Sequence, residues 1–343
     1  MRDPIFISGL RKSGTSLVKS LLDGHPDLFV FPANELHLFR YSWHPSMVKD
    51  KLARLSDPVE LLWAVARNPF ISRMANPEGP YHLREFDYNR FKEVISSSQV
   101  EGLKDVYETL MKAMYASLYG KELPSNLLTT SKTVLETEYF PEWLNMFSGC
   151  RFVYVLRNPY AHFVSVVRSL RTHAGKSKNK QTYEGMPLNI LQNPYPFLGP
   201  ELIRMRNSYH LMRKYAELYP RQFYILVYDD LLLDPEGQMR KLCKFLGISY
   251  RESLLQPTIL GKQWKGNSWF GGDFEAIDPS PLYHWKKYIH PGEIKILNRY
   301  FSEVIELYFE PLKPGGSLIP PFHASEYKPW VYLGNRLLYY LGL

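Results

Sequence analysis

The chain has 343 residues, of which 45% are hydrophobic and 15% aromatic, so it can bury a large core and is not a disordered chain. Its net charge of +8 favours anionic ligands. The basic residues do not gather into one long run and no nucleic-acid-binding motif is present, so we expect a moderately basic soluble enzyme and no nucleic-acid partner.

Short apolar runs alternate with helical patterns along the chain. Five runs are almost continuously apolar, as strands buried on both faces are: 5–8, 28–31, 127–131, 152–156 and 223–228. Apolar residues at helical spacing predict helices over 16–22, 100–119, 160–170 and 201–218. This alternation predicts an α/β fold, with a P-loop-like and mostly parallel central sheet of about five strands flanked by helices. In such folds ligands bind at the carboxyl ends of the strands.

No linker divides the chain, so we expect one domain over residues 1–343. Residues 172–200 are polar, basic and rich in proline and glycine, which predicts a long loop acting as a functional lid or a mobile insertion. The apolar tail at 327–343 is too short to span a bilayer. Two interpretations of the tail are open: it docks on the main body or on a second subunit of a homodimer, or it makes a peripheral contact with a membrane.

Cys150 and Cys243 stand in apolar surroundings and are predicted to be buried, since two separated cysteines make neither a disulfide framework nor a zinc site. The histidines have no ligand-like spacing, and we assign no metal. The first residues enter a strand pattern directly, without a signal peptide, and no apolar run reaches the ~20 residues of a membrane span. We therefore expect a cytoplasmic protein.

The stretch GLRKSGTS resembles a phosphate-binding loop with its lysine in an unusual place. Gly9 and Gly14 keep the spacing of G-x-x-x-x-G-K-[ST], but Thr15 stands at the lysine position and Lys12 lies inside the loop. A strand, a glycine turn and a helix N-terminus present backbone N–H groups to an anion. Three hydroxyl side chains add donors: Ser13, Thr15 and Ser16. The loop predicts a site for a phosphate-like group, with the Lys12 ammonium near a bridging or leaving oxygen.

A second constellation lies in RFVYVLRNPYAHFVSVVRSLR, residues 151–171. The buried strand delivers Arg157 at its carboxyl end, Pro159 begins the next helix, and Ser165 follows eight residues after the arginine. A guanidinium and a hydroxyl in this arrangement suit a second anionic group. Taken alone, Arg157 is equally compatible with a surface ion pair and Ser165 with an ordinary helical position.

Together, RKSGTS and the R-x7-S spacing resemble the two binding signatures of the sulfotransferases that use 3′-phosphoadenosine-5′-phosphosulfate (PAPS). LLDGHPDLFVFPANELHLF (21–39) is similar to a segment of the carbohydrate and tyrosylprotein branches. Further segments resemble the family in the expected order: VYDDLLLDPEGQMRKLCKFLGI (227–248), KQWKGNS (262–268) and HWKKYIHPGEIKIL (284–297). The resemblance runs from residue 5 to about residue 310.

The resemblance implies a role for each matching position. The 5′-phosphosulfate loop would comprise Arg11, Lys12, Ser13, Gly14, Thr15 and Ser16, with Lys12 at the catalytic position. Arg157 and Ser165 would bind the 3′-phosphate, assisted by Lys265 and Gly266 from a later loop. Glu35 matches the general base of the glutamate-using branches, and Lys132 matches a second active-site lysine.

The chemistry of sulfuryl transfer agrees with these roles. An in-line transfer needs a base at the acceptor hydroxyl and a cation at the leaving phosphate oxygen, which Glu35 and Lys12 would supply. His37 is a rival base, because residues 35 and 37 of an extended segment point the same way. Lys132 is also open to interpretation as a solvated charge. The sulfuryl group carries less charge than a phosphoryl group, so no metal is required.

The prediction is therefore a PAPS-dependent sulfotransferase that acts on a small-molecule or glycan hydroxyl, with a sugar favoured over a tyrosine or a lipid. Two alternatives remain open. One is a P-loop small-molecule kinase, and the other is a non-catalytic member of the family that binds the nucleotide.

Overall fold

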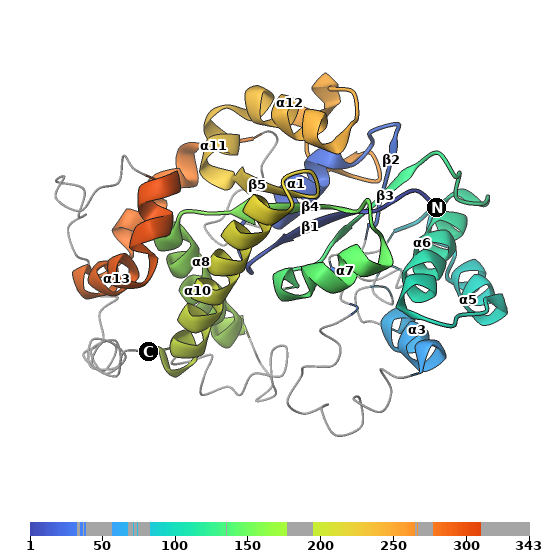
Figure 1. Cartoon of the computed structure of the whole chain (residues 1–343), viewed down its shortest axis with the longest axis horizontal. Coiled ribbons are helices and arrows are strands. Elements are labelled where there is room, and N and C mark those ends of the chain that lie inside the picture. Colours follow the sequence, from blue (N-terminus) through green and yellow to red (C-terminus); the bar gives the residue numbers. More distant parts are fainter. Residues whose placement is uncertain are drawn as a thin grey trace.

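The centre of the computed structural model is a parallel sheet of five strands (Figure 1). The structure describes residues 1–32, 35–36, 38, 57–67, 71, 74, 83–134, 136–176, 195–264, 266 and 277–309. The strands are β1 (Ile5–Gly9), β2 (Leu28–Val30), β3 (Leu128–Lys132), β4 (Arg151–Leu156) and β5 (Phe223–Val227). They lie in the order β2-β3-β1-β4-β5, and every pairing is parallel. The α/β fold and the five strands are as predicted.

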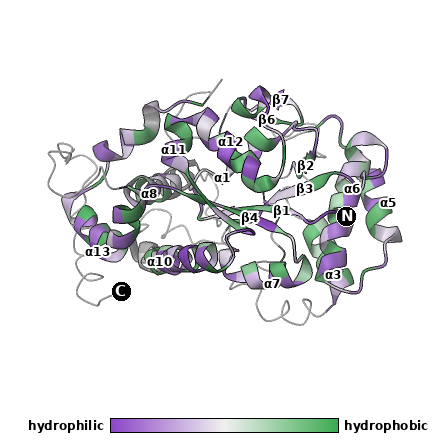
Figure 2. Cartoon of the chain, turned by 45° about the horizontal axis from the view of Figure 1, so that its top comes forward, coloured by the Kyte–Doolittle hydropathy of each residue, from purple (hydrophilic) through white to green (hydrophobic). Residues whose placement is uncertain are grey.

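Helices cover both faces of the sheet. The helices of the described residues are α1 (Thr15–Leu22), α3 (Pro58–Ala66), α5 (Tyr88–Ser97), α6 (Leu103–Tyr119), α7 (Phe140–Met146), α8 (Pro159–Lys176), α10 (Tyr195–Leu218), α11 (Tyr228–Leu233), α12 (Pro235–Leu246) and α13 (Pro291–Tyr308). Helices α1, α11 and α12 pack on one face, while α6, α7, α8 and α10 pack on the other (Figure 1). In Figure 2 the ribbons of α10 and α12 alternate between hydrophilic and hydrophobic residues, as expected of helices that bury one side.

The continuously apolar strands follow from this double cover. Successive side chains of a strand point to opposite faces, so a strand between two helix layers is mostly apolar. Strand β3 is the exception, since its last four residues are polar and buried. In β1, Ile5 and Ile7 face α1 and α12, whereas Phe6 faces α7. The Phe6 ring lies 4.1 Å from Trp143 and 5.1 Å from Phe152, measured between ring centroids. The two layers thereby seal both faces of the sheet and leave its strand ends for chemistry.

The described residues also contain smaller elements. Three 3₁₀ helices are η2 (Thr137–Tyr139), η3 (Glu252–Leu255) and η4 (Ser280–Lys287), and β6 (Thr258–Ile259) pairs with β7 (Lys262–Gln263) in an antiparallel hairpin. The side chain of Asp23, just after α1, accepts hydrogen bonds from Thr258 Oγ1 at 2.7 Å and from the Gly261 N–H at 2.9 Å. The hairpin is thus tied to the end of α1.

The predicted loop at 172–200 is wrong at both ends. Helix α8 continues to Lys176 and α10 begins at Tyr195, while residues 177–194 lie outside the described residues. Each polar residue in a helix costs less than about 1 kcal/mol relative to alanine, so a polar run can stay helical. A proline in a first turn, as at 196, has no intrahelical N–H bond to lose.

Helices α3 and α5 were not predicted from the periodicity, although their capping residues carried a signal. Asp57 accepts a hydrogen bond from the Val59 N–H at 2.9 Å, and Asp87 accepts one from the Asn89 N–H at 2.9 Å. An aspartate at this position satisfies N–H groups that a helix cannot pair internally. The predicted burial of the cysteines is confirmed, since Cys150 and Cys243 are free thiols in the core.

Candidate functional site

The loop between β1 and α1 has the backbone conformation that its glycines allow. Gly9 and Gly14 have φ values of 143° and 104°, in the region that favours glycine. A Cβ on Gly14 would lie 2.1 Å from the Tyr228 ring, so the glycine also permits a close approach. Lys12 has a φ of 63°, which is left-handed for a residue with a side chain. The turn is therefore held in a shape that an isolated chain would rarely adopt.

This loop suits an anion on three grounds. The first N–H groups of α1 have no partner within the helix and point out of its N-terminus. The Ser13 side chain is buried, and its Oγ makes no hydrogen bond within the described part of the chain. The Lys12 and Arg11 side chains are partly exposed beside it. A buried hydroxyl without a partner is costly, so a ligand oxygen at this position would satisfy it.

Glu35 and Lys132 meet directly beside this loop. The segment after β2 runs along β3, because the Phe31 N–H donates to Thr130 O and the Leu36 N–H donates to Lys132 O, both at 2.8 Å. This register brings Glu35 Oε1 to 3.1 Å from Lys132 Nζ. Side chains 97 residues apart in sequence thus form one ion pair at the strand ends.

Lys132 connects the glutamate to the phosphate-type loop. Its Nζ also donates a hydrogen bond to Ser16 Oγ at 2.9 Å, in the first turn of α1. The Lys132 side chain is only 3% exposed, whereas that of Glu35 is 24% exposed. Burial rules out the interpretation of Lys132 as a solvated charge. The more accessible Glu35 remains open to a reactant.

Lys19, which the sequence reasoning did not single out, lies behind this group. It is buried on α1 and donates to Pro32 O at 2.9 Å and to Phe31 O at 3.4 Å. Burial, and next the charge of Lys132, lower the pKa of Lys19 to about 7, although Asp23 and Glu35 act in the opposite direction. A lysine flanked by the apolar residues of an amphipathic helix was the signal in the sequence. Lys19 supports the segment that carries Glu35.

Arg157 occupies the carboxyl end of β4, as predicted. Its Nη1 donates to Lys12 O at 2.8 Å, and its guanidinium lies over the Tyr228 ring at 5.2 Å. Ser165 lies two turns into α8 and is buried. The arginine therefore contacts the loop after β1 from the neighbouring strand, while the joint role of Arg157 and Ser165 stays a prediction.

Asn158 and Asp229, also absent from the predicted site, fix the start of α8. Asn158 Oδ1 accepts from the Tyr160 N–H at 3.0 Å, in the manner of a helix cap, and the Asn158 N–H donates to Asp229 Oδ2 at 3.1 Å. Asp229 is partly buried, and desolvation raises its pKa above the usual value. These bonds anchor the turn that carries Arg157 to the start of α11.

Two predicted site residues, His37 and Lys265, lie outside the described residues. Gly266 is described and has a φ of 87°. In the part of the chain that the structure covers, no three His, Cys, Asp or Glu side chains gather as metal ligands, and no helix is long and apolar enough to cross a membrane.

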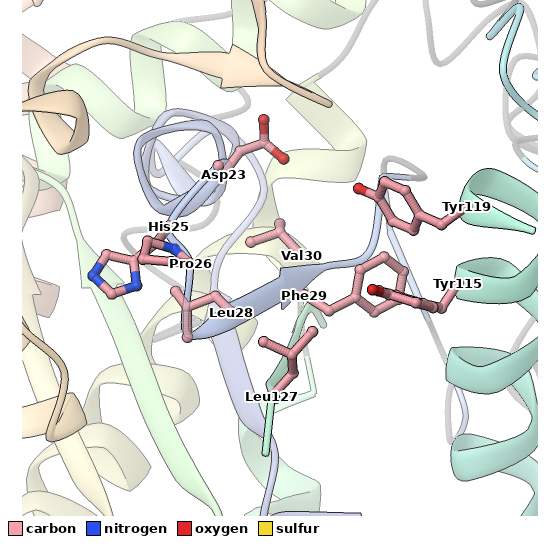
Figure 3. A pocket seen from close by; sticks show the side chains of 10 residues that line it. Asp23, His25, Pro26, Leu28, Phe29, Val30, Tyr115, Tyr119 and Leu127 are labelled. Carbon is pink, nitrogen blue, oxygen red and sulfur yellow. The ribbon is translucent and has the colours of Figure 1, made fainter. Parts of the chain in front are cut away.

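A pocket of about 220 Å³ opens elsewhere, at the amino ends of the strands (Figure 3). Asp23, at the end of α1, and His25 line one side, and Tyr115 and Tyr119 of α6 line the other. The phosphate-type loop, Glu35, Lys132 and Arg157 all lie at the opposite, carboxyl edge of the sheet. The pocket is therefore separate from the candidate site.

The amino-acid sequence matches a known family and named relatives. Residues 4–252 match the sequence model of a family described as the sulfotransferase family. Two omega-hydroxy-beta-dihydromenaquinone-9 sulfotransferases, from Mycobacterium bovis and Mycobacterium tuberculosis, are each 25% identical over 266 residues. That match covers 74% of this chain and 64% of the relatives, so it spans less than two thirds of their length.

Solved structures share the fold. The sulfotransferase domain from the curacin biosynthetic pathway superposes with a TM-score of 0.52 at 20% identity, covering 89% of this chain and 98% of that domain. The sulfotransferase domain of the olefin synthase from Synechococcus PCC 7002 gives a TM-score of 0.50 at 17% identity, covering 89% and 96%. At these identities the likeness concerns the fold alone.

Proposed function

Because the chain belongs to the sulfotransferase family, we propose that it transfers a sulfuryl group from PAPS to an acceptor hydroxyl, with Glu35 as the general base and Lys12 at the leaving phosphate. One observation carries the proposal. A partly accessible carboxylate is joined through buried Lys132 to Ser16 of the anion-binding loop, which brings a base within reach of a bound donor.

The donor would be held at two points. Its 5′-phosphosulfate would lie on the loop from Arg11 to Ser16, where the Ser13 hydroxyl and the N-terminus of α1 offer hydrogen bonds. Its 3′-phosphate would lie against Arg157 and Ser165, with Lys265 and Gly266 completing that subsite. Arg157 is supported in this role by its position at a strand end beside the loop.

The proposed step conserves charge and atoms. Glu35 accepts the proton of the acceptor hydroxyl as the acceptor oxygen forms a bond to sulfur. The bond between sulfur and the bridging 5′-phosphate oxygen breaks, and the bond pair leaves with 3′,5′-bisphosphoadenosine (PAP). Lys12 stabilises the charge that develops on that leaving oxygen, and Lys132 places a cation beside the sulfuryl group. The sulfate ester and PAP are the products.

We propose an aliphatic hydroxyl, on a sugar or a lipid, as the acceptor. An aliphatic alcohol is far less acidic than a phenol, so its reaction depends more strongly on a base such as Glu35. The resemblance to the carbohydrate branch favours a sugar, while the mycobacterial relatives are named for a hydroxylated menaquinone. His37 remains the alternative base.

The acceptor class can be found by incubating the protein with ³⁵S-labelled PAPS and cell extract, then separating the label into organic and aqueous phases. Label in a glycan or lipid fraction supports the proposal. Label confined to phenolic products would contradict an aliphatic acceptor. PAP should bind in calorimetry with EDTA present, whereas a kinase would bind ATP with Mg²⁺ instead. Binding of PAP without turnover of any fraction would favour the non-catalytic alternative.

The role of Glu35 is tested by Glu35→Gln, with Glu236→Gln on the exposed face of α12 as the control. Loss of the base should lower kcat by about a hundredfold or more, because the amide accepts no proton, while PAP affinity changes less than about threefold. Glu236→Gln should match the wild type. Normal turnover by Glu35→Gln would remove Glu35 as the base and direct attention to His37.

A further inference from the structure

Two successive backbone carbonyls of the loop after β1 accept hydrogen bonds from side chains of one neighbouring segment. His162 Nε2 lies 2.5 Å from Arg11 O, and Arg157 Nη1 donates to Lys12 O at 2.8 Å. Arg157 ends the turn from β4 and His162 lies in the first turns of α8. Both peptide units that flank the left-handed Lys12 are therefore fixed by hydrogen bonds from outside the loop.

The chemistry of the contact determines the form of His162. A carbonyl oxygen only accepts, so Nε2 carries the proton and donates to Arg11 O. His162 is fully buried, and desolvation lowers its pKa to about 4, so the ring is neutral near pH 7. Arg157 acts in the same direction, while Glu201 and the bond to Arg11 O oppose it. The ring is thus a neutral donor aimed at the loop.

The other ring nitrogen has no described counterpart. Within the described residues, His162 Nδ1 makes no hydrogen bond, and neither do Glu201 Oε1 and Tyr209 OH of α10. The charge of Glu201, whose Oε2 pairs with Arg204 Nη1, raises the pKa of both His162 and Tyr209. Buried histidines usually satisfy both nitrogens. Here the described polar contact of the ring goes to the loop alone.

We propose that His162 is a positioning residue that holds the Arg11–Lys12 turn in its left-handed form and so aims the Lys12 ammonium at the leaving oxygen. The inference rests on the role proposed for Lys12. Without the bond to Arg11 O, the turn can relax toward ordinary backbone angles, since a left-handed residue with a side chain is strained. Lys12 would then be displaced from the reacting atoms.

Two variants separate the hydrogen bond from packing. His162→Leu keeps an apolar volume but has no donor, whereas His162→Gln keeps an N–H close to the position of Nε2. Turnover is measured as PAP release with the acceptor that reacts fastest in the extract fractions, and calorimetry with PAP gives both affinity and the fraction of folded sites. We expect His162→Leu to lower kcat at least tenfold with PAP affinity within threefold, and His162→Gln to recover most of it. The exposed His210→Gln on α10 is the control.

A double-mutant cycle with Lys12→Met tests whether His162 acts through the lysine. In the Lys12→Met background, His162→Leu should cause little further loss of kcat. An equal loss in both backgrounds, or a His162→Gln variant as poor as His162→Leu, overturns the inference. Full activity of Lys12→Met would instead refute the role proposed for Lys12 and the inference with it, while an impaired Lys12→Met with additive losses refutes the inference alone.

Discussion

The cationic side chains of the candidate site have different surroundings, which give them different properties. Lys12 lies on a partly exposed turn, Lys132 is buried between a carboxylate and a hydroxyl, Lys19 is buried against carbonyls, and Arg157 lies over an aromatic ring. A buried charge is stable only when it is paired, so removing one partner leaves a larger penalty than an exposed pair would. Substitution of each of these side chains should therefore affect a different property of the protein.

Arg157 gives the sharpest test of donor binding. Arg157→Ala should weaken PAP binding by about 2–4 kcal/mol, because the 3′-phosphate would lose a charged partner in a partly desolvated site. Binding of 5′-AMP, which lacks the 3′-phosphate, should change far less. Calorimetry with both nucleotides measures the difference.

The control for this test is Arg206→Ala on the exposed face of α10, which should leave both affinities unchanged. An equal loss for PAP and 5′-AMP would show that Arg157 acts by shaping the loop through Lys12 O and not by contacting the 3′-phosphate. Unchanged affinity for PAP would move that subsite to other residues.

Helix α1 supports both the proposed anion site and Glu35, the proposed base. Its N-terminus carries Ser16, which binds Lys132, and Lys19 one turn later supports the carbonyls of the segment leading to Glu35. The extended segment after β2 then follows β3 through hydrogen bonds at Phe31 and Leu36. The position of Glu35 therefore depends on the packing of α1 against β2 and β3.

Burial of Lys19 predicts a dependence of stability on pH. Its pKa is about 7 in the folded protein, whereas a lysine side chain free in water, as in the unfolded chain, has a pKa of 10.5. Between these values the unfolded chain binds a proton that the folded protein does not, so stability rises with pH across this window, by up to about 1.4 kcal/mol per pH unit. Below pH 7 both states are protonated and this contribution becomes flat.

Urea unfolding of the wild type and of Lys19→Met between pH 7 and pH 9.5 measures this slope. Lys19→Met should flatten the rise, whatever its effect on absolute stability, since it also removes the bond to Pro32 O. Lys241→Met, on the exposed face of α12, should keep the wild-type slope. Equal slopes in all three proteins would mean that Lys19 stays protonated in the fold.

All five strands contribute to one edge of the molecule. Their carboxyl ends lead to the glycine loop after β1, the Glu35 segment after β2, Lys132 on β3, Arg157 after β4 and Tyr228 after β5. Because the strands are parallel and adjacent, groups distant in sequence meet there. A donor bound at this edge, as proposed, would link α1, α8 and α11 through one molecule.

Donor binding should therefore stabilise the whole protein. At a PAP concentration of about 100 times Kd, the free energy of unfolding should increase by about 2.7 kcal/mol, with a corresponding rise in Tm. EDTA should not reduce this rise, because the proposed site uses no metal. Thermal unfolding with PAP, with PAP and EDTA, and with ATP and Mg²⁺ checks this, and stabilisation only by the last mixture would favour a kinase.

Local patterns were sufficient for much of the fold. Mostly apolar runs located the strands of the sheet to within one residue, because a strand between two helix layers buries both of its faces. Strand β3 is buried in the same way, although four of its five residues are polar. The loop 172–200 was misjudged since proline, glycine and polar residues weaken a helix without forbidding it. The aspartates that cap α3 and α5 indicate where helices begin, which apolar periodicity alone does not detect.

The candidate site also has features that the sequence predicted and contacts that only the tertiary structure brings together. The glycine loop and Arg157 are local patterns, since a strand, a turn and a helix lie together in sequence, and the amino-acid order was enough to find them. Three contacts depend on strand order and register: the ion pair of Glu35 with Lys132, the hydrogen bond from Lys19 to Pro32 O, and the hydrogen bond from His162 to Arg11 O. Those contacts join residues that the chain separates, so only the packing of α1 and α8 against the parallel sheet could bring them within hydrogen-bond distance.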